Sequence, residues 1–211
     1  AQADAEAAGL KALASSALSG SLAGAKVALV VLPGASDDDV SALRSTLTDA
    51  GASVVGRVTL SDNWQSTSMS QYRTTLSTTL ASHLASPAAK TASADGVVGY
   101  SIVQVLTTTG AETDLLRQIL TDESTPIMTV DEDANGGATA IVAVGPRAQA
   151  AAVSNATPAA VTSNSDAWVG LAQAVGSTSG VLVGDASTRE AMVSQVRASG
   201  TGVTTVESVG T

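Results

Sequence analysis

Residues 26–64 read KVALVVLPGASDDDVSALRSTLTDAGASVVGRVTLSDNW and predict a strand, a tight loop, an amphipathic helix and a second strand. The first strand, at 27–32, is a continuous apolar run with β-branched members, which is typical of a strand buried on both faces of a sheet. Ser36 can cap the helix that follows, and Gly51 ends it. The second strand, at 53–60, completes a βαβ unit, so we expect the two strands to be parallel.

The end of the chain repeats this pattern. Residues 180–206 read GVLVGDASTREAMVSQVRASGTGVTTV, which predicts a strand, a small loop, a helix and a last strand. The helix is expected at 188–198, where Ser187 and Glu190 can form a capping box at its start. The last strand is expected at 203–206. Two similar βαβ units therefore share one sheet.

The middle of the chain carries further helical and extended patterns. Helices are expected at 71–85, 97–106, 112–120 and 166–175. The apolar run at 97–106 fits both the period of a helix and that of a strand, and we favour the helix. Strands are expected at 126–130 and 138–144, joined as a hairpin by the acidic, glycine-rich turn between them.

Together these patterns predict one α/β domain at 21–211, with a doubly wound, mostly parallel, Rossmann-like sheet. A length of 211 residues suits a single domain. Residues 1–20 are Ala-rich, and Leu10 and Leu13 approach a heptad spacing. They predict the end of an N-terminal stalk helix, with a short coiled-coil seam that could pair two copies of the chain.

The composition excludes several classes of function. Ten basic and nineteen acidic residues give a net charge of −9, and no basic stripe is present, so we expect no nucleic-acid partner. Cysteine is absent, which excludes disulfides, thiol catalysis and zinc–thiolate sites. No apolar run approaches the roughly 18 residues that a membrane-spanning helix needs.

The loop after the first strand, residues 33–39, is where such folds bind ligands. A dinucleotide site needs G-x-G-x-x-G at a helix N-terminus, and that pattern is missing here. Asp37, Asp38 and Asp39 instead occupy the first turn, where they complement the helix dipole and repel phosphate. Asp62, just past the second strand, could imitate a ribose-binding acid, but it lacks the glycines. We expect no nucleotide cofactor, and plain helix capping explains the aspartates.

A second acidic segment has the spacing of a calcium loop. Asp131, Asp133 and Asn135 match the opening D-x-[DN]-x-[DN]-G of an EF-hand. The bidentate acid expected at loop position twelve is replaced by Val142, and no helix pair flanks the segment. An acidic hairpin turn with Asn-Gly chemistry is the other explanation of the same residues.

Catalytic and copper-binding residues are scarce. His83 is the single histidine, no G-x-S-x-G elbow accompanies it, and we assign no catalytic residue. We therefore expect a solvated helix histidine, with weak metal-binding potential, and no enzymatic activity. Met69, Met128 and Met192 could hold copper(I) if they converged, whereas scattered methionines usually fill gaps in a core.

Trp64 lies in a polar loop, SDNWQSTS, of a chain with very few aromatic residues. Either the indole docks back on the core, or it is an anchor for a protein partner, because tryptophan is enriched at interface hot spots. With its neighbour Asp62 and the leucines of the stalk, Trp64 is our candidate for partner binding.

Residues 22–64 resemble the opening of the soluble domain in the actinobacterial copper-transport-protein-B (MctB) family. The motifs are V-x-x-P-G-A after the first strand, then A-G-A-x-V-x-G-x-V-x-L and a following tryptophan, in the family order. VAVGPR at 142–147 and TTVESVGT at 204–211 are similar to later landmarks. The resemblance covers about residues 20–211.

The resemblance implies a single-pass membrane protein, because members carry an N-terminal membrane helix and a stalk before an extracytoplasmic domain. It also implies one of two functions. One is copper efflux at the cell envelope. The other is the function of corynebacterial members called SteB, which act in cell separation, pair with SteA and control a peptidoglycan hydrolase.

The residues help to choose between these functions. Short buried strands interleaved with helices cannot form a pore. Copper traffic favours clusters of Cys, Met and His, which this chain lacks. We therefore predict a non-enzymatic scaffold of cell separation with a protein partner at the septum or envelope. Copper homeostasis is the alternative, and a small-ligand-binding or enzymatic domain is the third.

Overall fold

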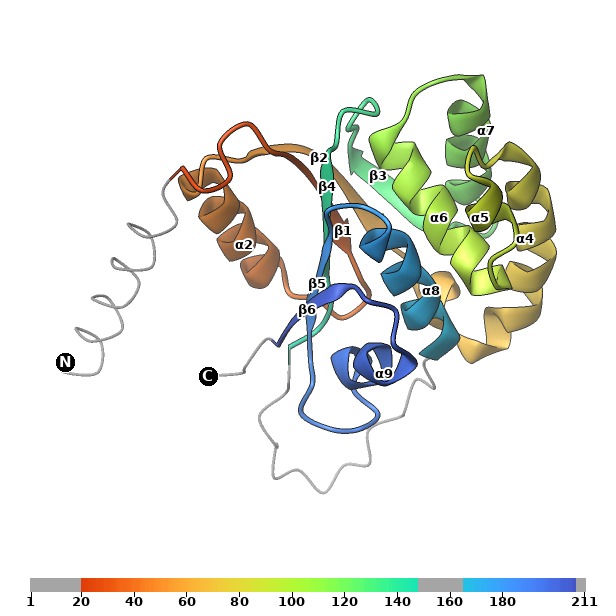
Figure 1. Ribbon diagram of the computed structural model, residues 1–211. Coiled ribbons are helices and arrows are strands. Elements are labelled where there is room, and N and C mark those ends of the chain that lie inside the picture. Colours follow the sequence, from red (N-terminus) through yellow and green to blue (C-terminus); the bar gives the residue numbers. More distant parts are fainter. Residues whose placement is uncertain (1–19, 148–164, 208–211) are drawn as a thin grey trace.

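The computed structural model describes residues 20–147 and 165–207, which form a mostly parallel sheet between helices (Figure 1). The predicted stalk, with Leu10 and Leu13, lies outside the described residues. The strands are β1 (Lys26–Val31), β2 (Ser53–Leu60), β3 (Met128–Glu132), β4 (Ala140–Val144), β5 (Val181–Gly184) and β6 (Thr204–Glu207). Their spatial order is β3-β2-β1-β4-β5-β6, and every neighbouring pair is parallel except β2 and β3, which are antiparallel.

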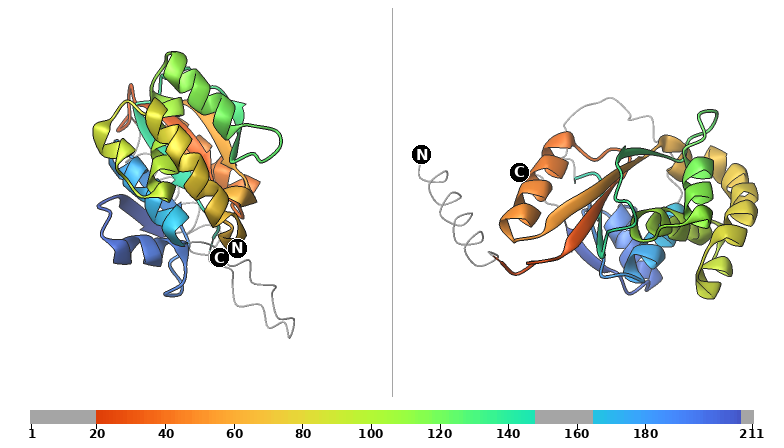
Figure 2. Two further views of the ribbon diagram at one scale, coloured as in Figure 1. Left: turned by 90° about the vertical axis from the view of Figure 1, so that its right-hand side faces the viewer. Right: turned by 90° about the horizontal axis from the view of Figure 1, so that it is seen from above.

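Helices cover both faces of the sheet. They are α2 (Asp37–Asp49), α3 (Asp62–Gln65), the 3₁₀ turn η1 (Thr67–Met69), α4 (Ser70–His83), α5 (Pro87–Lys90), α6 (Ala94–Thr107), α7 (Ala111–Leu120), α8 (Ser165–Gly176) and α9 (Met192–Ser199). α2 lies on one side of the sheet, and the larger layer that contains α4, α6 and α8 lies on the other (Figure 1, Figure 2). The α/β class and the mostly parallel sheet are thus confirmed. The helices predicted at 71–85, 97–106 and 112–120 are α4, α6 and α7.

Alternation along β1 divides the core into two layers. Ala28 and Val30 point into the larger helical layer, whereas Val27, Leu29 and Val31 pack on the side of α2. All five side chains are at most 5% exposed. The continuous apolar run of this strand follows from its central position, because both of its faces are covered.

The predicted hairpin between residues 126–130 and 138–144 is wrong. β3 pairs antiparallel with β2 at one edge of the sheet, whereas β4 pairs in parallel with β1. The connecting segment therefore passes over β2, where Ala134 packs against Gly56 so closely that any side chain at Gly56 would clash with it. Its far end is joined to β1 by the amide of Thr139, which donates to Lys26 O at 2.7 Å.

The capping box predicted at Ser187 and Glu190 is also wrong. α9 begins at Met192, and its N-cap residue, Ala191, offers no side-chain acceptor. The amide of Ser187 instead donates to Asp185 Oδ1 at 2.7 Å, which holds the loop in a local turn before the helix can start.

Glycines bring α6 and α8 into direct backbone contact, a feature that the sequence analysis did not identify. A Cβ atom on Gly99 would lie 2.7 Å from the carbonyl oxygen of Gly170. A Cβ atom on Gly170 would lie 2.6 Å from the amide nitrogen of Gly96. Since even alanine is too large at Gly99 and Gly170, these two residues set the distance between the helices. Within residues 20–147 and 165–207, none of the helices combines the length and the apolar character that crossing a membrane requires.

Candidate functional site at the ends of β1 and β4

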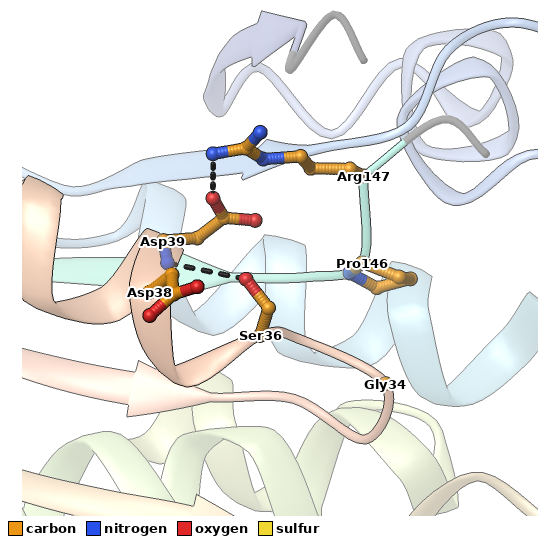
Figure 3. A pocket seen from close by; sticks show the side chains of 6 residues that line it. All are labelled: Gly34, Ser36, Asp38, Asp39, Pro146 and Arg147. Carbon is orange, nitrogen blue, oxygen red and sulfur yellow. Dashed lines mark hydrogen bonds and ion pairs between the residues drawn. The ribbon is translucent and has the colours of Figure 1, made fainter. Parts of the chain in front are cut away.

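A hollow of about 310 Å³ lies where β1 and β4 end (Figure 3). Its walls are Gly34, Ser36, Asp38, Asp39, Pro146 and Arg147. β1 and β4 are neighbours, but the chain continues from β1 towards one edge of the sheet and from β4 towards the other. In open α/β sheets this reversal is where ligands bind. The loop at residues 33–39 that the sequence singled out is therefore one wall of the expected crevice.

Local hydrogen bonds fix the loop after β1. Gly34 adopts a φ of 84°, a left-handed conformation that glycine takes without steric cost. The amide of Leu32 donates to Val144 O at 2.8 Å, which ties the ends of β1 and β4 together. Ser36 Oγ accepts the amide of Asp39 at 3.1 Å and caps α2, as predicted.

An ion pair between Arg147 and Asp39 spans the hollow. Figure 3 shows the guanidinium of Arg147 reaching from the end of β4 to the carboxylate of Asp39 in the first turn of α2. The side chain of Asp39 is 11% exposed and that of Arg147 is 47% exposed, so the arginine covers the acid. A phosphate at this helix N-terminus would meet a largely buried carboxylate, and Arg147, the one cation among the described lining residues, is already paired.

Met192 fills the neighbouring space at the ends of β4 and β5. Its methyl group and sulfur atom lie against Gly145 and Gly184, where a Cβ atom would overlap them. Met192 is 3% exposed and Met128 is 0% exposed, so both methionines pack in the core rather than converging on a metal. Met69 lies in η1, in another part of the fold.

Arginines contact the acidic segment that begins in the last residues of β3. Asp131 Oδ2 accepts the hydroxyl of Thr59 at 2.6 Å and lies 3.3 Å from Arg57 Nε. Asp133 Oδ1 accepts Arg117 Nη2 at 3.2 Å and the amide of Asn135 at 2.8 Å. The two carboxylates therefore serve different arginines. In the described parts of the chain, no group of three or more His, Asp or Glu residues is placed to hold a metal ion.

Arg44 of α2 forms a two-pronged ion pair with Glu132 of β3. Arg44 Nη2 donates to Glu132 Oε2 at 2.9 Å, and Nη1 contacts the other carboxylate oxygen. The hydrogen bond from Arg44 lowers the pKa of Glu132 below its ordinary value of 4.5, although partial burial of the carboxylate opposes this. The same bond raises the pKa of Arg44. This pair joins α2 to the antiparallel edge strand.

His83 ends α4 and contacts a carboxylate. Its Nδ1 lies 2.5 Å from Glu112 Oε2 in the first turn of α7. The carbonyl oxygen of His83 accepts Gln104 Nε2 at 3.1 Å, which ties the end of α4 to α6. The single histidine is 23% exposed and joins helices rather than standing free in solvent.

Trp64 is fully buried, so the indole docks on the core and is not exposed to a partner. The sequence could not distinguish these two arrangements. Its short helix α3 is held by Arg73, which is 0% exposed and which the sequence analysis missed. Arg73 Nε donates to Asp95 Oδ1 at 2.6 Å, and Nη1 donates to the carbonyl oxygens of Asn63 and Ser66 at 3.0 and 2.8 Å. Asp62, at the start of α3, remains exposed.

These features define a class: an α/β domain in which an ion pair between the protein's own side chains spans the crevice at the reversal of strand order. The sequence matches, over residues 1–211, the family described as copper transport outer membrane protein, MctB. The chain therefore belongs to this family, as its motifs predicted. No curated protein matches the sequence.

Proposed function

We propose that this chain is a cell-envelope protein of copper homeostasis whose α/β domain is a non-enzymatic module that recognises a protein partner. The family description supports the location and the process. The ion pair that spans the crevice supports the role of the domain. Open α/β sheets bind small ligands at the reversal of strand order. At that place in this chain, Arg147 pairs with Asp39 over the hollow, and Met192 fills the adjacent space.

The partner, rather than the domain, would meet the metal. His83 Nδ1 is engaged with Glu112, and the thioethers of Met128 and Met192 are packed in the core. Copper(I) would have to break these contacts before it could use His83 Nδ1 or either of these thioethers as a ligand.

A calorimetric titration of the chain with copper(I) and with copper(II), under controlled redox conditions, tests this role. We expect no stoichiometric binding tighter than about 1 μM, a threshold of about 8 kcal/mol. Tighter binding contradicts the proposal. Loss of that binding in His83→Gln or in Met69→Leu would then identify a ligand and make the domain a copper carrier.

Cell separation is the second candidate function. The chain resembles SteB-type members of the family through the ordered motifs at 22–64. A domain without an assigned catalytic residue suits a scaffold that pairs with SteA at the septum. In this reading Asp62, exposed on the α3 turn that Arg73 holds in place, belongs to the partner surface.

A strain that lacks the protein separates the two functions. The copper proposal predicts growth inhibition at copper concentrations that the parent tolerates, with normally separated cells. The cell-separation proposal predicts chains of unseparated cells at ordinary copper. Complementation with the parent chain and with Asp62→Asn then tests the α3 surface, since only a partner contact would make the substitution matter at an exposed position.

The architecture and anchoring complete the proposal. We infer kinship with doubly wound, Rossmann-like domains from the strand order, which runs 3-2-1-4-5-6, and from helices on both faces. The antiparallel β3 departs from that pattern. Residues 1–20 would be the stalk that connects the domain to a single membrane helix, with the domain outside the cytoplasm. Protease protection in whole cells and in spheroplasts tests this orientation.

A further inference from the structure

A second pocket, of about 360 Å³, lies among the ends of the helices in the larger layer. It is lined by residues that follow or end α4, by α5, by the last turns of α6 and by residues that follow α8. These are Leu84, Ala85, Ser86, Ala88, Ala89, Tyr100, Val103, Gln104, Thr107, Thr108, Ser177 and Thr178. This pocket is separate from the hollow at the ends of β1 and β4, and the proposed function makes no use of it.

Three helix C-termini meet at this pocket. α4 ends at His83, α6 at Thr107 and α8 at Gly176, and the residues directly after each of these ends line the walls. Each helix has 12 or 14 residues, so each brings the negative end of a developed dipole, about half an elementary charge. These three helix ends therefore each place a negative partial charge beside the pocket.

The described lining residues include no charged side chain of either sign, so none opposes the helix ends. The nearby Lys90, which ends α5, is exposed. Tyr100 lines the pocket and is partly buried against the core, which places an aromatic side chain within reach of a bound cation. Leu84, Ala89 and Val103, which are at most 5% exposed, supply an apolar floor.

Gln104 holds the walls in position. Its Oε1 accepts the amide of Ala85 at 2.9 Å, and its Nε2 donates to His83 O, so both ends of its amide are used to join α4 to α6. The hydroxyl of Thr107 donates to Val103 O in α6, and that of Thr178, just after α8, donates to Val175 O, which leaves the oxygen lone pairs of both as acceptors. The pocket thus combines an apolar floor, an aromatic ring and a rim of acceptors.

We propose that this pocket binds an alkylammonium group, that is, a primary amine on a short aliphatic chain. The aliphatic part would rest on the apolar floor, and the ammonium would face Tyr100 and the helix ends. The amine can be a free small molecule or the side chain of a lysine on a partner, and the chemistry of recognition is the same.

An NMR titration of the ¹⁵N-labelled chain with n-butylammonium tests the proposal, with n-pentanol as the neutral probe of matched size. We expect saturable shifts at Tyr100, Gln104 and Thr178, with binding about tenfold tighter for the amine, since three helix dipoles act on it. Equal affinity for the two probes, or shifts elsewhere in the protein, would overturn the proposal.

A charge series at one exposed wall position gives a second readout that does not depend on refolding the core. Ala88 is exposed on α5, so Ala88→Lys, Ala88→Gln and Ala88→Glu should all fold. We expect Lys to weaken amine binding several-fold, Gln to leave it unchanged and Glu to strengthen it. An affinity that ignores the sign of the charge refutes an ammonium site.

The source of the amine follows from a third probe, Nα-acetyl-lysine methylamide. Binding as tight as that of n-butylammonium would support the site and identify a lysine side chain of a partner as its occupant. Binding of n-butylammonium alone would support the site for a free amine, because the peptide backbone would then be excluded by the walls.

Discussion

Replacing Gly170 with alanine would push α8 away from α6. The added Cβ atom would lie 2.5 Å from the carbonyl oxygen of Asp95 and 2.6 Å from the amide nitrogen of Gly96, both backbone atoms. Ordinary contacts begin at 3.4 Å, so the helices must separate by about 0.9 Å at this point. No rotamer change can relieve the clash, because the atoms in contact belong to the backbone itself.

The free energy of unfolding should fall by about 2 kcal/mol. Overpacking costs about 1–3 kcal/mol, and a clash between backbones belongs at the upper end. Alanine returns up to about 1 kcal/mol through its higher helix propensity. In a chain of this length the loss corresponds to a melting temperature lower by roughly 4–8 °C. Urea unfolding followed by circular dichroism and by tryptophan fluorescence measures it, since Trp168 lies on α8 itself.

Gly96→Ala is the matched control on α6. Its Cβ atom would meet Ala92 Cβ at 3.0 Å, Ser93 Oγ at 3.1 Å and Gln173 Oε1 at 3.4 Å, all side-chain atoms. We expect a stability within about 1 kcal/mol of the parent, because these contacts need to lengthen by only a few tenths of an ångström and alanine favours the helix. If Gly170→Ala proves as stable as Gly96→Ala, close backbone packing does not set the distance between α6 and α8.

Three further predictions concern the crevice and the α2 face. Met192→Ala should cost about 2–4 kcal/mol in urea unfolding, since it empties the space at the ends of β4 and β5, whereas Met192→Leu should cost under about 1.5 kcal/mol. Equal effects would mean that the space is not filled by the thioether. Arg147→Gln should lower the free energy of unfolding by about 1 kcal/mol, because it leaves the carboxylate of Asp39 unpaired. Adding Asp39→Asn should restore most of this loss. A thermal melt in which the double variant is less stable than either single variant contradicts the ion pair. Glu132→Gln should be less stable than the parent at about pH 7, with a gap that closes towards about pH 3. The lowered pKa of Glu132 means that its pairing with Arg44 stabilises the fold above the ordinary value of 4.5, and that this stability is lost as the pH falls through the folded-state pKa. The pair is 41% exposed, so the gap should also shrink in high salt, and a gap independent of pH and salt argues against it.

Local periodicity predicted most of the elements. The βαβ unit at 26–60 and the helix at 112–120 were predictable because their apolar residues repeat within one element. The hairpin failed because β3 and β4 are adjacent in sequence but β4 belongs beside β1, and pairing in a sheet is decided by which strand completes the core. Gly56 lies close to Ala134 where the segment between β3 and β4 passes over β2. Nothing in a single sequence predicts this contact.

The candidate site was predictable only in part. The loop at 33–39 was identified from its place after a buried strand, and Ser36 was predicted correctly as the cap of the helix that follows. The pairing of Asp39 with Arg147 could not be predicted, because it requires that β1 and β4 be neighbours. Trp64 had two arrangements open to it, and Arg73, which holds its loop, looks like any other helix arginine in the sequence.

The position of β1 between β2 and β4 has a consequence for the chain while it is being synthesised on the ribosome. The amide of Lys26 donates to Thr139 Oγ1 across 113 residues of chain, and the apolar side chains of β1 have no second neighbour until that later segment exists. At synthesis rates of about 5–20 residues per second, the delay is roughly 6–23 s. During that interval one edge of β1 has no paired strand, because β4 has not yet been made. An unpaired apolar strand is prone to aggregate, so β1 is a natural binding site for a chaperone of nascent chains.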